Sequence, residues 1–484
     1  MKKKAQMGLL CLAGILMLAC GLTGTSAEPT PAGPVDITLG PDGGGGYGNL
    51  AEAIAGVPAG SAIRLDAGIY RLEQPLLIDK EISLIGSGTD LTKIISSAGE
   101  YVIRFDGAAP FRAYDITFSY EGTRLSDVVV VKSAEVLINN CRFLGARSSE
   151  EDAFYRAGLA LLGETSGKVQ NCEFLNNPYG IGTETSAADV LFEGNRLHHN
   201  TYAGIKYFAG SGGIARNNEV YENGLSGIIL VGEAAPLLEN NNLHHNTESG
   251  IVYFENSNGT ARNNECLANG FNGISVTDSA RVVLDGNTCV ENTDNGIRIA
   301  GNASAAVKGN ICSRNGLHGI LVREQTQVEL IENTLEGNTE FGIAFFGTSK
   351  GTVQGNTSTG NGLHGLGTQD EPNVRVLGNV FNRNKEAGMR ISDNSVVEIR
   401  GNECIGNQLT GIIIRAQAEA TLDGNRSNEN MESGIAFFQN ASGIVTNNEC
   451  ANNALKGIAV GKDNRVTLEN NNCYGNGGED IYQE

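Results

Sequence analysis

Apolar residues recur at fixed positions between Asn195 and Asn476, and this pattern predicts the fold of most of the chain. The positions belong to a short repeat that is marked by an asparagine. Apolar residues stand three positions before that asparagine and ten positions after it, and position plus twelve is mostly β-branched or aromatic. A spacing of two is the periodicity of a β-strand, and so short a repeat leaves no room for a useful helix beside such strands. Each repeat is therefore predicted to hold several short strands.

Asparagine and glycine mark the turns between these strands. The first asparagine of the repeat stands at positions 195, 218, 241, 264, 287, 310, 333, 356, 379, 402, 425, 448 and 471. A second asparagine follows five positions later, and glycine follows four positions after that until Asp480 replaces it in the last copy. Asparagine tolerates left-handed turn conformations, and its side-chain amide can bond the same amide in the coils above and below.

A fixed period of this length is typical of a solenoid, in which each coil buries its apolar face against its neighbours. The pattern favours an all-β, single-stranded parallel β-helix of 23-residue coils with asparagine ladders. A leucine-rich-repeat horseshoe would need a leucine-dominated core and one asparagine per repeat, whereas this chain has two asparagines and an Ile/Val core. We expect one continuous domain, with a cap and irregular coils at 35–194 and regular coils at 195–484.

The N-terminus has the pattern of an export signal. Lys2 to Lys4 precede an apolar run that ends at Ala19, too short to span a bilayer, so residues 1–19 are predicted to be a signal peptide. The run closes on Met-Leu-Ala-Cys, which resembles a bacterial lipobox and implies lipidation of Cys20. Ordinary cleavage after Ala27 is the alternative. Residues 20–34 are predicted to be a flexible tether. We therefore expect an extracytoplasmic protein, lipid-anchored to a bacterial membrane or cell surface, and otherwise periplasmic or secreted.

Residues 49–57 are predicted to form a short helix that caps the N-terminal end of the β-helix, which would otherwise expose strand edges and core. Asn49 stands at an N-cap position with Glu52 three residues later. Leu50, Ile54 and Val57 would share one face of the helix and cover the end of the core.

Residues 36–145 resemble the opening of pectinesterases, in the pectin-lyase-like superfamily. The likeness rests on Pro41-Asp42-Gly43, Ala53-Ile54, Gly68-Ile69-Tyr70, the run from Ile82 to Gly88, the run from Tyr114 to Phe118 and the run from Asn140 to Gly145. The resemblance implies a right-handed β-helix. It fails where the chemistry would begin, because pectinesterases carry Gln-Asp after this point and this chain has Ala146-Arg147-Ser148. Pectin demethylation is therefore not expected. From Asn195 onward the chain resembles β-helix repeats of bacterial exported proteins, some of which bind or hydrolyse carbohydrate.

One irregular segment offers candidate catalytic carboxylates. Asn140 and Asn171 stand further apart than neighbouring asparagines of the repeat do, and the excess segment between them holds Glu150 and Asp152. Loops on a rigid scaffold often carry function. A plain surface insertion is the alternative.

Two features of the regular coils also suggest chemistry. Aromatic residues at position plus thirteen are expected to face outward and could stack on sugar rings, and they are Phe208, Phe254, Phe346 and Phe438. Their neighbours Tyr207, Tyr253, Phe345 and Phe437 are expected to face the core. His318 and His364 lie near Glu340. A histidine beside a carboxylate can donate and accept protons in acid–base catalysis. Packing between coils, or scattered surface substitution, would produce the same residues.

Charge and cysteine usage exclude other classes. A net charge of −20 without a basic cluster beyond the N-terminus disfavours nucleic acid. A column of cysteines occupies a position that is otherwise apolar, so we expect buried free thiols rather than metal ligands. The column holds Cys266, Cys289, Cys312, Cys404, Cys450 and Cys473. No metal site or cofactor is predicted, and the acidic residues lie too far apart along the stack for the calcium site that β-helix lyases use.

These observations lead to two hypotheses for function. The first is an exported, lipid-anchored β-helix that binds polysaccharide and processes it as a lyase or glycoside hydrolase, or binds without cleavage. The second is a non-catalytic structural or adhesin-like surface protein, with a protein partner at its C-terminal end.

Overall fold

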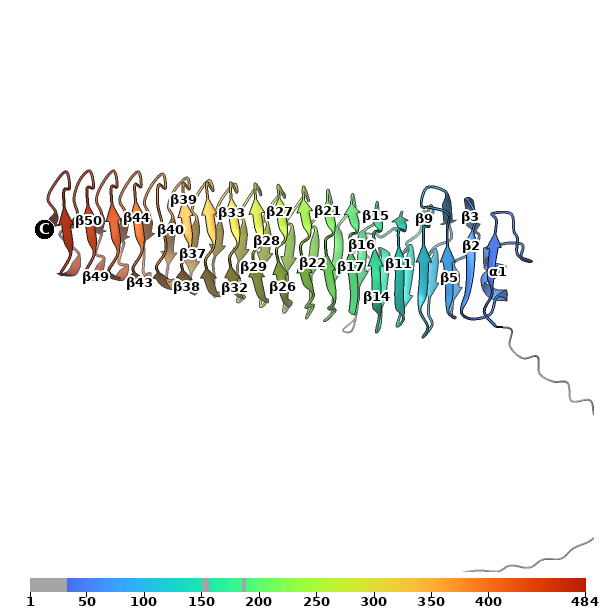
Figure 1. Cartoon of the computed structure of the whole chain (residues 1–484). Coiled ribbons are helices and arrows are strands. Elements are labelled where there is room, and N and C mark those ends of the chain that lie inside the picture. The colour runs from blue at the N-terminus through green and yellow to red at the C-terminus, as the bar shows by residue number, and fades with distance from the viewer. Residues whose placement is uncertain (1–32, 150–155, 185–188) are drawn as a thin grey trace, which may run out of the picture. The chain divides into compact units, whose positions relative to one another are not determined.

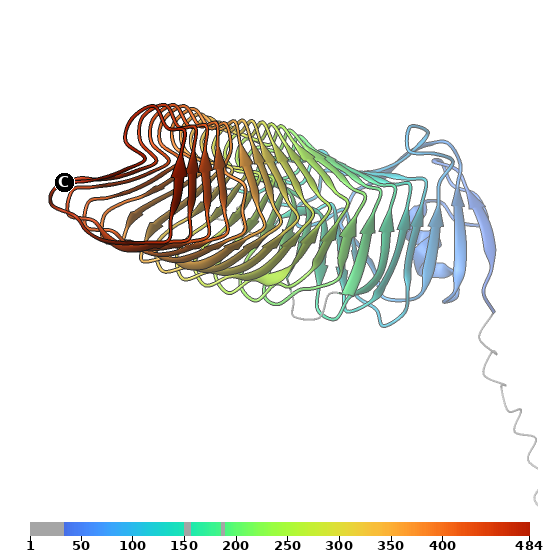
Figure 2. The same cartoon turned by 60° about the vertical axis from the view of Figure 1, so that its left-hand side comes forward.

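The computed structural model describes residues 33–149, 156–184 and 189–484. Within these, Pro34–Glu484 form one compact unit, a stack of parallel β-coils that begins at helix α1 (Leu50–Gly56) and runs toward the C-terminus (Figure 1). The signal peptide, Cys20 and nearly all of the tether lie outside the described residues, as do Glu150 and Asp152. Figure 2 shows the coils nearer to the axis of the stack, one behind another. A complete coil contributes one strand to each of three sheets. The predicted all-β, parallel β-helix is confirmed.

The first sheet is formed by the strand that precedes the first asparagine of each regular coil. Among the described residues it holds 19 strands, each paired in parallel with the strands of the coils before and after it. In order along the stack they are β1 (Asp36–Leu39), β2 (Ser61–Leu65), β5 (Ile82–Ile85), β8 (Phe111–Tyr114), β11 (Glu135–Asn139), β14 (Ser166–Gln170), β17 (Asp189–Glu193), β20 (Ile214–Arg216), β23 (Leu237–Glu239), β26 (Asn258–Arg262), β29 (Arg281–Asp285), β32 (Ser304–Lys308), β35 (Gln327–Ile331), β38 (Lys350–Gln354), β41 (Asn373–Leu377), β43 (Val396–Arg400), β46 (Glu419–Asp423), β49 (Ser442–Thr446) and β52 (Arg465–Glu469).

The second sheet is formed by the short strand between the two asparagines. Its strands are β3 (Gly68–Leu72), β6 (Thr92–Ser96), β9 (Thr117–Tyr120), β12 (Arg142–Leu144), β15 (Glu173–Leu175), β18 (Arg196–His198), β21 (Glu219–Tyr221), β24 (Asn242–His244), β27 (Glu265–Leu267), β30 (Thr288–Val290), β33 (Ile311–Ser313), β36 (Thr334–Glu336), β39 (Thr357–Thr359), β44 (Glu403–Ile405), β47 (Arg426–Asn428), β50 (Glu449–Ala451) and β53 (Asn472–Tyr474). Between β39 and β44 the sheet continues through single bridges at Val380.

The third sheet is formed by the strand that follows the glycine of each repeat. Its strands are β4 (Leu76–Ile78), β7 (Ile103–Phe105), β10 (Val129–Lys132), β13 (Ala157–Leu162), β16 (Tyr179–Thr183), β19 (Ala203–Tyr207), β22 (Ile228–Leu230), β25 (Ile251–Tyr253), β28 (Ile274–Val276), β31 (Ile297–Ile299), β34 (Ile320–Val322), β37 (Ile343–Gly347), β40 (Leu366–Asp370), β42 (Met389–Ile391), β45 (Ile412–Arg415), β48 (Ile435–Phe438), β51 (Ile458–Val460) and β54 (Ile481–Gln483). Because the coils stack in register, the outward residues of this sheet form a continuous row along the stack.

Helix α1 caps the N-terminal end as the sequence predicts. The Asn49 side chain accepts a hydrogen bond from the Glu52 backbone N–H at 2.9 Å, and the Glu52 carboxylate accepts one in return from the Gly48 backbone N–H. Leu50 and Ile54 are at most 3% exposed. No helix in the described part of the chain is long and apolar enough to cross a membrane.

Two asparagine ladders hold the regular coils together. In a typical step, the backbone N–H and the side-chain amide of Asn241 both donate to Oδ1 of Asn264, at 3.0 and 2.9 Å. The same amide also donates to the Ala215 carbonyl at 2.8 Å. Each rung thus satisfies buried turn groups that no sheet hydrogen bond reaches. The second ladder begins one coil earlier than the sequence indicates, at Asn177, which donates to Asn200.

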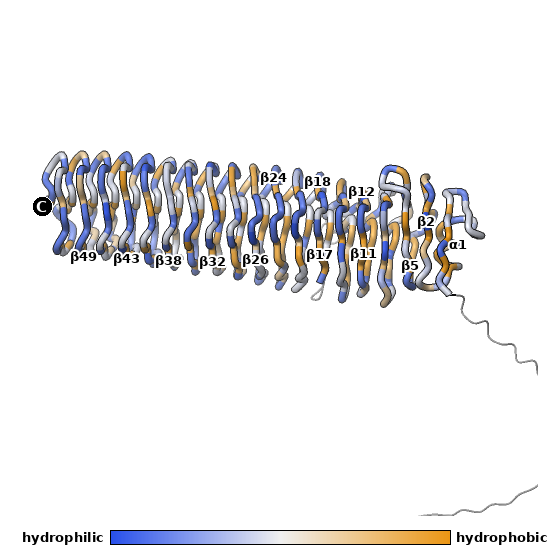
Figure 3. The backbone as a smooth tube through the Cα atoms, in the orientation of Figure 1, coloured by the Kyte–Doolittle hydropathy of each residue, from blue (hydrophilic) through white to orange (hydrophobic). Residues whose placement is uncertain are grey.

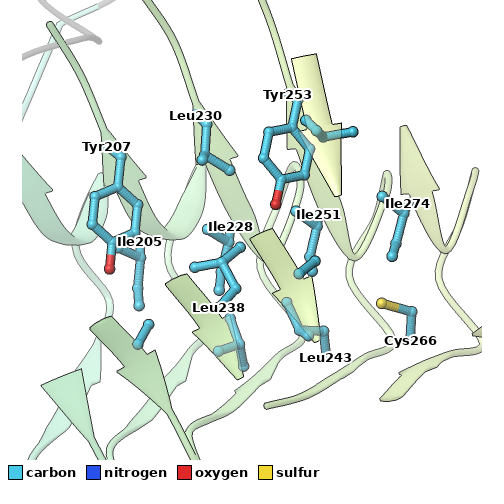
Figure 4. Close-up of a cluster of buried hydrophobic side chains, with 14 of the residues drawn as sticks. Ile205, Tyr207, Ile228, Leu230, Leu238, Leu243, Ile251, Tyr253, Cys266 and Ile274 are labelled. Carbon is cyan, nitrogen blue, oxygen red and sulfur yellow. The ribbon is translucent and has the colours of Figure 1, made fainter. Parts of the chain in front are cut away.

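The core is filled by identical positions of successive coils. Ile205, Ile228 and Ile251 stack on one another, and Tyr207 and Tyr253 reach the same interior (Figure 4). Figure 3 shows apolar and polar positions recurring at similar places from coil to coil. The cysteines of the predicted column are free thiols, all buried except the half-buried Cys473.

The residues two positions before the first asparagine of each repeat alternate in charge from Glu193 to Lys308, and only some of them form ion pairs with the next coil. Arg216 pairs with Glu193 at 2.7 Å and Arg262 with Glu239 at 3.3 Å. Lys308, however, pairs with Glu332 at 3.8 Å rather than with the aspartate of the preceding coil. A flexible lysine reaches the turn as easily as its column neighbour, and such exposed pairs contribute little stability.

Candidate functional site

The outer face of the third sheet carries a cleft where the coils are irregular. Aligned strands place Arg104, Val130, Ala160, Gly182 and Lys206 in one outward row. The three middle residues are small or short, so the floor between the two cations is low. Four strand spacings separate Arg104 from Lys206, which is roughly 19 Å along the stack. We call this surface the third-sheet cleft.

A cavity of about 480 Å³ occupies part of this cleft. Its lining combines charged, aromatic and small apolar side chains, a mixture typical of a ligand site. The lining residues are Glu100, Tyr101, Arg104, Asp127, Val130, Arg156, Ala160, Leu162 and Glu184.

Asp127 is the buried charged group of this cavity. It lies two residues before the strand β10 and is 5% exposed. Its Oδ1 accepts the Ala157 backbone N–H at 2.7 Å, and its Oδ2 lies 3.0 Å from Nη1 of Arg156. Burial raises the pKa of Asp127 to about 6, although the Ala157 N–H and Arg156 act in the opposite direction. A carboxyl with a pKa near neutrality is suited to donating and accepting a proton.

Aromatic side chains surround the lysine end of the cleft. Nζ of Lys206 lies 5.2 Å from the ring centroid of Tyr179 and 5.1 Å from that of Phe208. Tyr202 packs on Tyr179 with a centroid distance of 5.3 Å. Burial lowers the pKa of Lys206, and Glu184 works against that shift. The arrangement offers ring faces, a cation and hydroxyl groups within one surface.

The regular coils extend the same outward row with a longer period. Lys206, Arg298 and Arg390 occupy equivalent outward positions four coils apart, on β19, β31 and β42. Nε of Arg390 is buried without a hydrogen-bond partner. Two coils after each cation the third sheet carries two adjacent aromatic residues, which are Tyr253-Phe254, Phe345-Phe346 and Phe437-Phe438. The sequence pattern revealed the rings but not the cations that alternate with them.

The four predicted sugar-stacking rings differ in exposure. Phe254 is 38% exposed and Phe438 is 45% exposed, as expected for outward rings. Phe208 and Phe346 are less exposed than these two rings. Phe208 packs beside Lys206, and Phe346 packs against Phe341 and its neighbours. The inward partners Tyr207, Tyr253, Phe345 and Phe437 are fully buried, which confirms the predicted alternation. Sugar binding by the outward rings stays a prediction.

His318 and His364 belong to a third ladder at the corner before the third sheet. The His318 backbone N–H donates to Oδ1 of Asn295 at 3.2 Å, and Nδ1 of His318 accepts the Phe341 backbone N–H at 3.3 Å. Nδ1 of His364 accepts the Ala387 N–H in the same way at 3.1 Å. In the coils before His318 serine or asparagine fills this position, as at Ser249 and Asn295. The histidines therefore act as hydrogen-bond acceptors in the ladder.

The predicted contacts between these histidines and carboxylates are present. Nε2 of His318 lies 3.4 Å from Oε2 of Glu340, and Nε2 of His364 lies 3.2 Å from Oε2 of Glu386. Burial lowers the pKa of His318 to about 4, and burial together with Arg390 lowers that of His364 to about 3. Both rings are thus neutral at physiological pH, with Nδ1 already engaged. A catalytic role for His318, His364 or Glu340 stays a prediction, as it does for Glu150 and Asp152.

The sequence pattern pointed to the neighbourhood of the cleft but not to its residues. The segment that lengthens the spacing between Asn140 and Asn171 ends at Arg156, and this residue lines the cavity. Asp127 gave no signal, because it occupies no repeat position and its partners come from other coils. Within the described ranges, no group of three or more His, Cys, Asp or Glu side chains converges to hold a metal ion.

Comparisons with known proteins place these features in context. The family model of the right-handed β-helix region matches residues 126–289, 272–426 and 394–484. No curated protein sequence matches the chain. Among solved structures, the periplasmic alginate epimerase AlgG is similar at 18% identity over 69% of this chain and 82% of its own, with a TM-score of 0.47. The N-terminal fragment of bacteriophage Phi29 gene product 12 is similar at 11% identity over 86% and 88%, with a TM-score of 0.48. A GH87 α-1,3-glucanase from Streptomyces thermodiastaticus strain HF3-3 is similar at 14% identity over 94% and 70%, with a TM-score of 0.31.

Proposed function

The chain belongs to the right-handed β-helix family, and on that scaffold we propose that it binds a linear polysaccharide in the third-sheet cleft and processes it there. The observation that carries the proposal is the cleft itself. A low floor runs between Arg104 and Lys206, ring faces line its sides, and the buried Asp127 opens onto it. An extended polymer fits such a row better than a compact ligand does.

The aromatic residues supply the binding surface. Tyr101 and Tyr202 are half-buried and pack against the small residues of the floor, and Phe208 flanks Lys206. The apolar faces of sugars lie against such rings, while hydroxyl groups bond to the charged side chains between them. Phe254, Phe346 and Phe438 would prolong the path for a longer chain, with smaller contributions.

Asp127 is the group that the processing step would use. Its pKa of about 6 lets it exchange a proton near neutrality. Hydrolysis of a glycosidic bond requires a second carboxyl, and Glu100 and Glu184 line the same cavity. Arg156 beside Asp127 would hold a substrate oxygen or steady the charge of the carboxylate.

Export is part of the proposal. It rests on the apolar segment of residues 1–19 and on the lipobox pattern that ends at Cys20. The mass of the N-terminal peptide of the mature protein tests it: a diacylated Cys20 supports anchoring, cleavage after Ala27 supports release, and an intact N-terminus contradicts export.

The proposed function is tested by following binding and product release together on a panel of neutral and acidic polysaccharides. Tyr202→Ala is expected to weaken binding at least tenfold, because a stacking ring is lost. Asp127→Asn is expected to abolish product release while leaving binding within about twofold. Phe271→Ala is the matched control, since this ring is 49% exposed but lies away from the cleft. Binding that is unchanged in Tyr202→Ala, or absent from the native protein, overturns the proposal.

A structural or adhesin-like role is the second candidate, and the ladders favour it. Continuous side-chain hydrogen bonding through the regular coils makes them a rigid shaft that needs no ligand. In that case a protein partner, at the C-terminal end or elsewhere, takes the place of the polysaccharide, and the native protein shows neither glycan binding nor turnover.

A further inference from the structure

Four of the six histidines form two pairs at the corner that follows the second sheet. His198 ends β18 and is followed by His199, and two coils later His244 ends β24 and is followed by His245. The second residue of each pair has a left-handed backbone, with φ of 53° in one and 54° in the other. This turn folds the second ring back toward the first. Nδ1 lies 2.8 Å from Nδ1 in the first pair and 2.9 Å in the second.

The carboxylates around the first pair decide which nitrogens carry protons. Nε2 of His198 lies 3.2 Å from Oε1 of Glu173, and Nε2 of His199 lies 3.0 Å from Oε2 of Glu222. Although burial opposes ionisation of Glu173, hydrogen bonds from Arg142 and His198 lower its pKa overall. Glu173 and Glu222 accept hydrogen bonds, so they favour hydrogen on both Nε2 atoms and leave the two Nδ1 atoms turned toward each other. Without metal the two Nδ1 atoms share a proton in an N–H···N hydrogen bond, and a metal ion bound by both nitrogens would replace that proton.

We propose that each histidine pair chelates one divalent transition-metal ion, of the Cu(II) or Ni(II) type, through its two Nδ1 atoms. Metal–imidazole bonds of about 2.0–2.1 Å that meet at a right angle place the two nitrogens about 2.9 Å apart. Tetrahedral coordination would place them about 3.3 Å apart at the same bond length. The observed separations therefore match neighbouring positions of a square-planar or tetragonal ion, the geometry of Cu(II) and Ni(II) with nitrogen ligands.

The surroundings of the first pair resemble a prepared ligand shell. Metal-binding histidines commonly donate their other ring N–H to a carboxylate, which fixes the tautomer and the ring orientation. Glu173 and Glu222 are placed for that role. In the second pair Nε2 of His244 lies 3.6 Å from Oε1 of Glu219, a looser version of the same contact.

Stacking holds the two pairs in register. The ring of Tyr221 lies between His198 and His244, with centroid distances of 4.7 and 5.1 Å and interplanar angles of 12° and 7°. The Tyr221 hydroxyl accepts a hydrogen bond of 2.6 Å from Nη2 of Arg196. The rings that supply half of the ligands are therefore fixed before any metal arrives, and preorganisation of this kind favours binding.

The sites open to solvent and take the remainder of their ligands from it. The His199 side chain is 55% exposed. Burial is the main cause that lowers the pKa of His198, which keeps this imidazole in the neutral, ligand-competent form. Because the described residues hold no group of three or more convergent His, Cys, Asp or Glu ligands, water fills the other coordination positions.

Titration of the full chain with Cu(II), followed by electron paramagnetic resonance, tests the proposal. The native protein is expected to bind two ions, each with the hyperfine pattern of two imidazole nitrogens. His199→Ala and His245→Ala should each remove one ion, and the double variant should remove both. These two residues are exposed, so the fold is not at risk. Binding should weaken at acid pH, because protons compete with the metal ion for the imidazole nitrogens. Ni(II) followed by calorimetry gives a second readout.

The remaining two histidines provide the control. His318→Asn combined with His364→Asn introduces the side chain that already serves this ladder at Asn295, and it should leave the count at two ions. A count that stays at two in the His199→Ala, His245→Ala double variant overturns the proposal. So does native protein that binds no nitrogen-coordinated Cu(II) at micromolar free metal.

Discussion

The regular coils at 195–484 and the irregular coils at 35–194 share one backbone design but use their turns differently. In the regular coils, asparagines fill both buried turn positions, as in the step from Asn292 to Asn315. In the preceding coils those turns hold other residues, such as Cys141 and Cys172, and the coil length varies. The ladders fix every turn to one length. Variation in coil length and the cavity around Asp127 are therefore confined to coils that lack a complete pair of ladders. The regular coils are thus joined by side-chain hydrogen bonds, and the irregular coils leave room for a cavity.

Breaking a ladder rung should have the largest effect. In Asn315→Ala the backbone N–H of Asn292 loses its acceptor, and the side-chain bond between the two residues disappears. A buried donor without a partner costs about 1–3 kcal/mol and the lost hydrogen bonds add to that, so we expect a destabilisation of about 3 kcal/mol. Urea unfolding measures it, and amide exchange should show the loss centred on the adjacent coils.

Asn256→Ala is the matched control for the rung. Asn256 is an exposed turn residue whose carbonyl accepts a side-chain hydrogen bond, which alanine preserves. A change within about 0.5 kcal/mol is expected. Equal losses of unfolding free energy in the two variants would mean that a ladder asparagine stabilises the protein no more than an exposed asparagine does.

The pH dependence of stability should reveal Asp127. Its folded pKa of about 6 exceeds the ordinary value of 3.8, so its contribution to stability is fully present below pH 4 and is lost as pH rises through 6. The loss is at most about 3 kcal/mol. Asp127→Asn should remove this decline, so the difference in unfolding free energy between native and variant protein should change between pH 4 and pH 6. Parallel curves over this range would contradict the raised pKa.

Glycine in the turn before the third sheet should resist substitution. A Cβ at Gly319 would lie 2.7 Å from the Gly342 carbonyl oxygen and 2.8 Å from Cδ2 of Leu335. Overpacking of this kind costs about 1–3 kcal/mol, and thermal unfolding of Gly319→Ala should report it. Gly309→Ala is the comparison, because nothing lies within 4 Å of its Cβ and only its φ of +63° is strained. Its cost should be smaller, about 1 kcal/mol. If Gly309→Ala is the more damaging change, backbone conformation rather than crowding explains the glycine column.

The smallest effect concerns the two core tyrosines. The hydroxyl groups of Tyr207 and Tyr253 are buried without hydrogen-bond partners, and burial raises the pKa of both. Tyr253→Phe removes an unsatisfied polar atom, so the unfolding free energy should stay the same or rise by less than about 1 kcal/mol. A clear loss of stability in urea unfolding would show that a water molecule is hydrogen-bonded to the hydroxyl.

The sequence predicted what repeats and missed what does not. The asparagine ladders and the inward rings such as Phe345 follow from fixed spacing, because equal positions in equal coils meet the same environment. The capping helix was predicted from its own N-cap pattern at Asn49. The floor of the cleft does not repeat. Each of its outward residues stands a whole coil further along the chain than the one before, and these coils differ in length, so only the strand register brings the residues into one row. They are Arg104, Val130, Ala160, Gly182 and Lys206.

The third ladder shows a different limit. Serine, asparagine and histidine all occur at its position, as in Ser249, Asn295 and His318. Their shared use as hydrogen-bond acceptors is visible only when the backbone donors are placed, as for the Phe341 N–H that reaches His318. In the sequence alone the histidines resemble a catalytic patch.

The most direct test of where function lies compares polysaccharide affinity after removing one ring from each region. Tyr101→Ala alters the cavity in the irregular coils, and Phe438→Ala alters an exposed ring in the regular coils. If the irregular coils hold the site, isothermal titration should show at least a tenfold loss for Tyr101→Ala and no more than about twofold for Phe438→Ala. Equal losses, or a larger loss for Phe438→Ala, would contradict the placement of function in the third-sheet cleft.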